Sequence, residues 1–213
     1  MGENDDRGGG LTEAARAAAE RLTFFSDAVV AIAITLLAID LPVPEGNSVE
    51  ELLSALRAHS YEYLAFVISF LVIANHWTIH HRVFGWVRRV DGAVIRLNLF
   101  WLLLVVVNPF LTRVLTEGDS NILRFGMYAT AQALMMLALA AMIAILARKH
   151  WFAADAPADL NGHGYVRSLL GVATFVVSVP AYLLIGQWAF AIWAVGPILG
   201  GYLLRSSGVL THR

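Results

Sequence analysis

Long apolar runs alternate with short polar connections along the chain, and six of the runs approach the roughly 20 residues that a helix needs to cross a bilayer core. The runs cover residues 22–42, 61–82, 93–115, 122–147, 166–186 and 188–205. The pattern therefore predicts an all-α fold, a polytopic membrane protein with six transmembrane helices per chain. No Gly-rich segment resembles a loop that re-enters the membrane between two helices.

The same pattern divides the chain into three segments. Residues 1–20 form an N-terminal segment that we expect to be partly disordered at its Gly-rich start and helical toward the first run, with Thr12 as a plausible N-cap. Residues 21–205 form the six-span domain, and residues 206–213 form a C-terminal tail.

Composition supports a membrane protein. Of the 213 residues, 58% are apolar and 15% are charged, whereas a soluble domain is nearer half apolar and a quarter charged. The formal net charge of -1 provides no basic surplus to neutralise phosphates, which argues against a nucleic-acid partner. The chain has no cysteine, so disulfides and thiolate metal sites are excluded.

Basic residues indicate the orientation, because cytoplasmic loops of membrane proteins are enriched in Lys and Arg. The N-terminal segment, the connection between runs 2 and 3, the connection between runs 4 and 5 and the C-terminus hold 12 of the 15 Lys and Arg residues. The other side holds only Arg57, Arg113 and Arg124. We therefore expect both termini to be cytoplasmic.

Polar residues gather at one depth, near the cytoplasmic ends of runs 1 to 3. Buried polar groups in membranes usually pair with one another or mark a pathway. We expect Asp27 to accept hydrogen bonds from His76 or His80 and Asn98 to complete the network; the alternative is that these side chains only reach toward the headgroup region. The candidate network residues are Arg21, Ser26, Asp27, Asn75, His76, His80 and Asn98.

A second feature is a stripe on the far half of run 1, formed by Ile32, Thr35, Leu36 and Ile39. Their spacing places them on one helical face. From the residues alone, such a face is lipid-facing or part of the core. The Thr35 hydroxyl is equally consistent with a local structural role, because hydroxyls in membrane helices often hydrogen-bond to the backbone of their own helix.

Several motifs together resemble a known family. The stretch Arg21-x-x-x-Phe25-Ser26-Asp27 is similar to the RxxxFSD signature of the transmembrane protein 175 family, potassium channels of endosomes and lysosomes with prokaryotic relatives. The resemblance extends over residues 20–205, with Ala28 as a minor departure from the Gly of many relatives. The further matching motifs are Asn75-His76-Trp77, His80-His81, Arg96-Leu97-Asn98 and Asn108-Pro109-Phe110-Leu111-Thr112.

The resemblance implies a function and a site. It implies a potassium-selective channel in a prokaryotic cell membrane, a homotetramer with the first helix of each chain lining the pore. Carried over by position, Ile32 is the main hydrophobic constriction, Leu36 and Ile39 form further apolar rings, and Thr35 forms a hydroxyl ring. Potassium is then the permeant ion and no cofactor is expected. The polar network holds the pore helix against runs 2 and 3.

Three other functions stay open at this stage. His76-x-x-x-His80-His81 has a ligand-like spacing, because residues i and i+4 share a helical face, so a metal-dependent membrane enzyme is one alternative. A secondary transporter is less well supported, because neither inverted repeats nor broken helices are visible. A non-conducting structural protein is the third.

Overall fold

The computed structural model describes residues 3–118, 121–162, 164–193 and 195–196, and these residues form helices joined by short connections. The only pairing of extended backbone among them is a single bridge between Val87 and Phe152. The helices are α1 (Glu3–Leu36), α2 (Val49–Ala58), α3 (Ser60–Phe84), α4 (Gly92–Thr116), α5 (Ile122–Arg148), α6 (Ala158–Gly162), α7 (Gly164–Ile185) and the 3₁₀ helix η1 (Gly186–Ala189).

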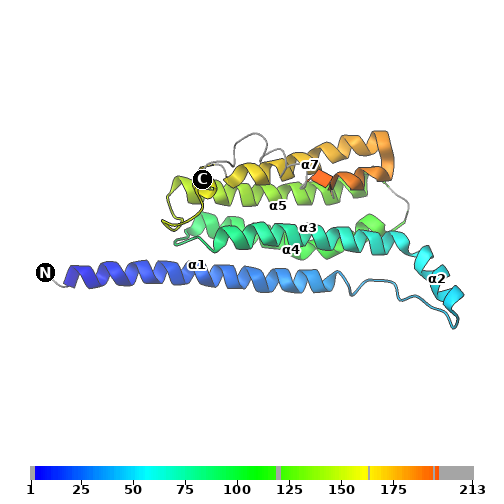
Figure 1. Ribbon diagram of the computed structural model, residues 1–213, viewed down its shortest axis with the longest axis horizontal. Coiled ribbons are helices and arrows are strands. Elements are labelled where there is room, and N and C mark those ends of the chain that lie inside the picture. Colours follow the sequence, from blue (N-terminus) through cyan, green and yellow to red (C-terminus); the bar gives the residue numbers. More distant parts are fainter. Residues whose placement is uncertain (1–2, 119–120, 163, 194, 197–213) are drawn as a thin grey trace.

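The long helices lie side by side in layers (Figure 1). Helices α5 and α7 form one layer, α3 and α4 form the next, and α1 runs along the side of α3 and α4 that is remote from α7. The short helix α2 projects beyond the end of the bundle. Helix α1 is therefore a peripheral element, with neighbours in the chain on one side only.

The prediction of six transmembrane helices is wrong. Among the described residues, four helices are long and apolar enough to cross a membrane, namely α3, α4, α5 and α7. The first predicted run fails because the last 18 residues of α1 include Glu20, Arg21 and Asp27, and the helix ends at Leu36 rather than near residue 42. Most of the predicted run 188–205 lies outside the described residues.

The contacts of α1 follow a regular repeat. Its buried residues are separated by alternating steps of four and three, the repeat of a helix that keeps one narrow seam on its neighbours. Four of the six are Ala, Ser or Thr, small residues that let helix backbones approach closely where hydrophobic burial gives no driving force. The seam consists of Ala19, Thr23, Ser26, Val30, Ala33 and Leu37.

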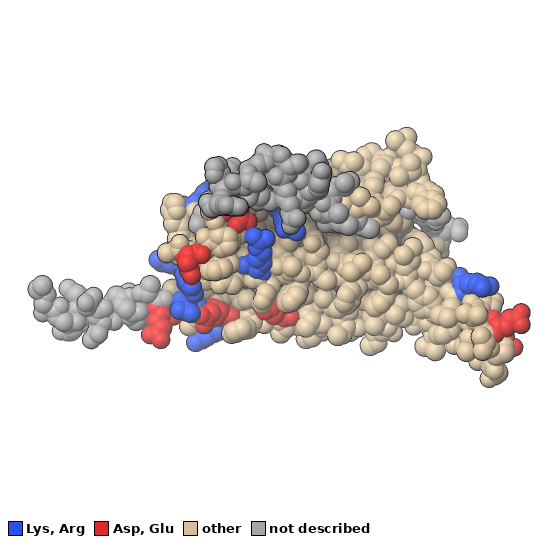
Figure 2. All heavy atoms as spheres, viewed as in Figure 1, with Lys and Arg blue, Asp and Glu red and all other residues tan. Residues whose placement is uncertain are grey.

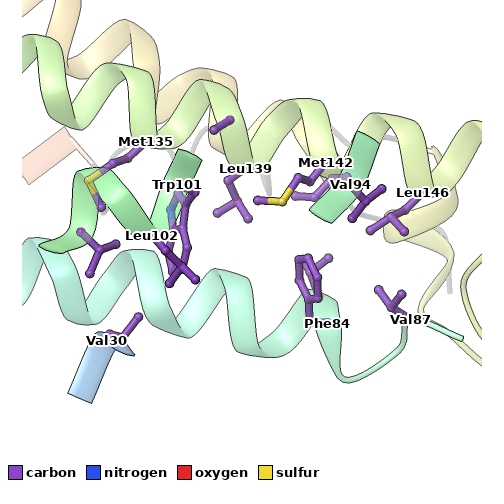
Figure 3. Close-up of a cluster of buried hydrophobic side chains, with 14 of the residues drawn as sticks. Val30, Phe84, Val87, Val94, Trp101, Leu102, Met135, Leu139, Met142 and Leu146 are labelled. Atoms are coloured by element: carbon purple, nitrogen blue, oxygen red, sulfur yellow. The ribbon is translucent and has the colours of Figure 1, made fainter. Parts of the chain in front are cut away.

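The bundle centre lies between α3, α4 and α5 (Figure 3). Trp101 of α4 and Leu139 of α5 are fully buried there, next to Leu102 and Met142. Val30 of α1 points toward the same cluster from the far side. This is one of two apolar clusters among the described residues, and α1 joins it through its seam.

The bundle end that holds the α3–α4 connection is closed by paired loops and charges, and we call it the α3–α4 end. Charged side chains gather over it in Figure 2, whereas much of the surface toward α2 shows none on that face.

Asp91 caps α4 by accepting hydrogen bonds from the amides of Ala93 and Val94 at 3.0 Å. It also receives a hydrogen bond from Lys149 at 2.5 Å, which joins the start of α4 to the end of α5. This bond with Lys149, together with the backbone bonds, lowers the pKa of Asp91 to about 2.

Asp91→Asn should flatten the acid dependence of stability. A carboxyl group with a depressed pKa in the folded protein stabilises it above the unfolded pKa of about 4, and that contribution disappears as the pH falls toward 2. Asparagine still caps α4 but has no carboxylate to protonate. Thermal unfolding of the detergent-solubilised protein between pH 2 and 7 measures the effect.

The control is Glu45→Gln, which removes an exposed carboxylate outside the α3–α4 end. It should leave the acid dependence as it is in the wild type. If Asp91→Asn and the wild type lose stability equally on acidification, the pair with Lys149 does not stabilise the fold.

Candidate functional site

A buried chain of hydrogen bonds connects α1, α3 and α4. The His80 Nε2 and Asn98 Oδ1 atoms are 2.8 Å apart, and the Asn98 amide donates to the Ser26 Oγ at 2.9 Å. The Ser26 hydroxyl in turn donates to the Leu22 carbonyl at 2.8 Å. The side chains of His80, Asn98 and Ser26 are completely shielded from solvent. This chain places three predicted network residues in direct contact.

The order of donors in this chain defines the protonation of His80. Because the Asn98 amide nitrogen is used toward Ser26, its Oδ1 atom must accept from His80, so Nε2 carries the proton. The imidazole is held between two aromatic rings, Phe84 at 4.1 Å and Trp101 at 4.5 Å between centroids, both stacked. Ring stacking and the hydrogen bond together fix the His80 side chain in one orientation.

Asp27 bonds to α3, but to other residues than the sequence suggested. Its two carboxylate oxygens lie 2.8 Å from the Trp77 Nε1 and 3.3 Å from the His81 Nδ1. Trp77 and His81 share one face of α3, with ring centroids 5.1 Å apart, and the expected partners His76 and His80 point into the bundle instead. Asp27 is thus a partly exposed second tie between α1 and α3, separate from the buried chain.

The remaining predicted network residues do not join either set of bonds. The Arg21 side chain is exposed and Asn75 is half-buried, and neither side chain has a hydrogen bond or ion pair to another described residue. His76 is fully buried on α3, but neither ring nitrogen has a hydrogen-bond partner in the described part of the chain. The expected single network is therefore two sets of bonds, with His76 apart from both.

The predicted stripe on α1 lies on the side opposite the seam. Ile32, Leu36 and Ile39 are 61%, 40% and 75% exposed, whereas the seam residues Val30, Ala33 and Leu37 are at most 5% exposed. Thr35 is also exposed, and its hydroxyl donates to the Ile32 carbonyl at 2.8 Å. The stripe is an apolar face with one hydroxyl, and nothing in the described chain covers it.

The end of α1 is held in place by two further contacts. The helix passes into turns from residue 37, where the amide of Ile39 bonds to the Leu36 carbonyl at 3.2 Å. Asp40 lies 3.5 Å from the Arg113 guanidinium of α4. The Tyr63 hydroxyl donates to the Pro42 carbonyl at 2.7 Å. Ile39 therefore lies in a turn beyond the α-helix, but next to anchored residues.

Sequence reasoning missed some polar residues. Trp77 and His81 lie four positions apart and therefore share one face of α3. That spacing could have identified them together as partners of Asp27. Asn108 of α4 and Gln132 of α5 are fully buried within their membrane-spanning helices. Their position in apolar runs was the available signal, since buried amides there are costly.

The described residues contain no group of three or more His, Cys, Asp or Glu side chains arranged to hold a metal ion. His80 of the ligand-like histidine motif is bonded to Asn98, and His81 faces Asp27. Two of the three histidines of this motif are thus part of helix-to-helix contacts.

Comparisons with known proteins agree with this architecture. Residues 21–109 match the family model described as endosomal/lysosomal potassium channel TMEM175. A potassium channel of Streptomyces collinus is 42% identical over 120 residues, 56% of this chain and 58% of that protein. A potassium channel of Chamaesiphon minutus is 44% identical over 99 residues, 46% of this chain and 49% of that protein. The chain spans about half the length of the curated relatives it matches.

A solved structure covers more of the fold. The crystal structure of a lysosomal potassium-selective channel TMEM175 homolog from Chamaesiphon minutus matches with a TM-score of 0.72 at 27% identity, over 89% of this chain and 98% of that one. The chain is accordingly an all-helical membrane protein whose fold matches that structure. The resemblance predicted from the motifs is confirmed: the chain is similar to TMEM175 potassium channels in sequence and in fold.

Asn98→Leu should destabilise the protein by about 1–3 kcal/mol, because it leaves the buried His80 Nε2 proton without an acceptor. Leucine keeps a similar volume, so the effect reports mainly on hydrogen bonding. The measurement is thermal unfolding of the solubilised protein.

Asn75→Leu is the matched control, since it makes the same chemical change at a half-buried position of α3. It should change the stability much less than Asn98→Leu. Equal effects of the two substitutions would mean that the buried hydrogen-bond chain does not hold α1 in place.

Proposed function

We propose that the chain is one subunit of a homotetrameric potassium channel in a prokaryotic cell membrane, with the exposed stripe of α1 as the pore wall. The observation that carries the proposal is the division of α1 into a buried seam and an uncovered apolar stripe. The relatives named as potassium channels and the solved homolog support the choice of function. No observation favours a metal-dependent enzyme or a structural protein, and the named relatives are channels.

The stripe has the chemistry of a hydrophobic gate. Four copies of Ile32 around an axis would form a ring of branched apolar side chains, and a sufficiently narrow ring of this kind excludes water and stops ions. Leu36 lies one turn further along the same face, and Ile39 follows in the turn after the helix. A small outward displacement of α1 would widen all of these rings together.

Thr35 supplies the one polar group on the stripe. Its hydroxyl proton is used toward the Ile32 carbonyl, so its oxygen lone pairs remain available. In the proposed pore, four such oxygens would replace part of the hydration shell of a cation. This ring gives a polar position within an otherwise apolar wall.

The two sets of bonds around Ser26 and Asp27 set the position of the pore wall. Ser26 is on the seam, six residues before Ile32, and its bond to Asn98 fixes the height and rotation of α1 relative to α4. Asp27 adds a contact with α3. The residues proposed to face ions are thus oriented by residues on the opposite face of the same helix.

Charge supports an assignment of orientation. Arg82, Arg88, Arg89, Arg148 and Lys149 lie at or near the α3–α4 end. Basic residues in short loops favour the cytoplasm, so this end and the N-terminus would be cytoplasmic. Asp40 and Glu45 would then lie at the outer mouth, where Arg113 partly neutralises Asp40.

Ile32→Asn should increase ion flux and reduce the preference for potassium over sodium, because an amide ring stays hydrated where an isoleucine ring does not. The measurement compares potassium and sodium flux from liposomes that contain the purified protein. Leu103→Asn is the control, since Leu103 is similarly exposed on α4 but is not on the stripe. If the Ile32→Asn variant has the same flux as the control, Ile32 does not line the pore.

Ile39→Cys should form disulfide-linked dimers in the membrane under mild oxidation, because the proposed axis brings the copies of this turn together. The chain has no cysteine of its own, so no background reaction occurs. Leu123→Cys, exposed at the start of α5, is the control and should remain monomeric on a denaturing gel. Linkage at Leu123 and not at Ile39 would contradict an α1-lined pore.

A further inference from the structure

Three fully buried side chains inside the helix bundle have no hydrogen-bond partner among the described residues. They are Asn108 of α4, Gln132 of α5 and His76 of α3, each 0% exposed and each with two polar side-chain atoms. Trp101 and Ser168 are also fully buried without a partner among the described residues, but each has a single polar side-chain atom. Both polar atoms of each side chain lack a partner in the described part of the chain: the two amide atoms of Asn108 and of Gln132, and both ring nitrogens of His76. A buried polar group left unpaired costs about 1–3 kcal/mol, so this group calls for a partner.

A neighbouring layer of hydrogen bonds establishes that the three side chains lie near one another. The Thr112 hydroxyl donates to the Ser69 Oγ at 2.9 Å and the Tyr128 hydroxyl donates to the same atom at 3.1 Å, which fixes the register of α3, α4 and α5. Asn108 lies four residues before Thr112, and Gln132 lies four residues after Tyr128. Since α4 and α5 run in opposite directions, both amides are displaced by one turn, about 5.4 Å, toward the α3–α4 end.

His76 completes the group from α3. It lies seven residues, about two turns, beyond Ser69 in the same direction. The Gln132 side chain lies near the His76 ring, but the two side chains do not have the geometry of a direct hydrogen bond. Beyond His76, the next turn of α3 carries His80 and the bonds to Asn98 and Ser26. The three side chains therefore lie between two layers that are already hydrogen-bonded.

The chemistry of the three side chains selects the ligand. Two amides and a neutral imidazole offer hydrogen-bond donors and acceptors together and carry no net charge. None of the three is a carboxylate that would hold a cation. The complementary ligand is small, neutral and able both to donate and to accept, which describes water.

We propose that Asn108, Gln132 and His76 form a binding site for water inside each chain, between α3, α4 and α5. The bound water connects the three helices at a depth where no direct side-chain bond does so. The site is separate from the exposed stripe of α1 and does not depend on the proposed channel function or on the number of subunits.

The direct test is a crystallographic or electron-microscopic map of the wild-type protein in lipid, at a resolution that shows ordered water. We expect at least one density peak within about 2.7–3.2 Å of polar atoms from two or more of the three side chains. Rotated amides of Asn108 and Gln132 that bond directly to each other or to His76, with no peak between them, would overturn the proposal.

A second test uses the coupling of substitutions. If water bridges the two amides, Asn108→Leu or Gln132→Met alone strands the water and the other amide, whereas the double variant removes the polar pair. We expect each single variant to lower the melting temperature by about 3 °C or more and the double variant to lower it by clearly less than the sum. Leu139→Met, at a buried apolar position of α5, controls for repacking and should have little effect.

Strictly additive losses would mean that no shared ligand joins the amides and would overturn the proposal. If the double variant does not fold, the map of the wild-type protein decides alone. Neither test uses ion flux, so a failure of the channel proposal would leave both results unchanged.

Discussion

Inside a bilayer a buried polar side chain must find its partner within the protein, and the chain of bonds from His80 through Asn98 to Ser26 meets this requirement across three helices. Association of membrane helices gains little from burying apolar side chains, because lipid is equally apolar. Close packing of small residues and specific hydrogen bonds must therefore determine where α1 lies. The seam supplies the first through Ala19 and Ala33, and Asn98 supplies the second.

This arrangement places a mechanical condition on any movement of α1. Ser26 is tied to α4 and Asp27 to α3, so the first part of the helix cannot rotate without breaking these hydrogen bonds. In the described part of the chain, the residues between Asp27 and Asp40 are held by van der Waals packing, with Val30, Ala33 and Leu37 the most deeply buried, until Asp40 meets Arg113. A movement that changes the spacing of Ile32 between copies must bend α1 beyond Asp27 or carry α3 and α4 with it.

The sequence predicted the parts of this structure that depend on local pattern. Helices α3, α4, α5 and α7 agree with the predicted runs within a few residues, because each is a long apolar run bounded by polar connections. The prediction failed at α1, where Glu20, Arg21 and Asp27 lie inside the helix and the apolar part is short. Hydropathy counts such residues as interruptions, whereas the fold uses one of them, Asp27, as a contact to α3.

Candidate site residues show the same division. Ser26, His80 and Asn98 were identified because polar residues at one depth are expected to meet, and the structure brings them together. The partners of Asp27 were not identified, because they depend on which face of α3 meets α1. Composition does not specify that rotation, so it could not decide among His76, Trp77, His80 and His81. Residue spacing indicated the stripe on α1, and the family resemblance implied its role as a pore wall. The structure adds that no described residue covers this face.

Polar residues at successive depths also explain why the bundle has one register. Ser69, Thr112 and Tyr128 join α3, α4 and α5 at one level, and His80 and Asn98 join α3 and α4 about three turns of α3 away. A slip of α4 by one turn would keep most apolar contacts, because one leucine or valine side chain can take the place of another in apolar surroundings. It would strand Thr112 and Asn98 at the same time, and two buried unpaired groups together cost about 2–6 kcal/mol. In a protein with so few polar residues in its interior, these few define the alignment of the helices, and the apolar majority follows them.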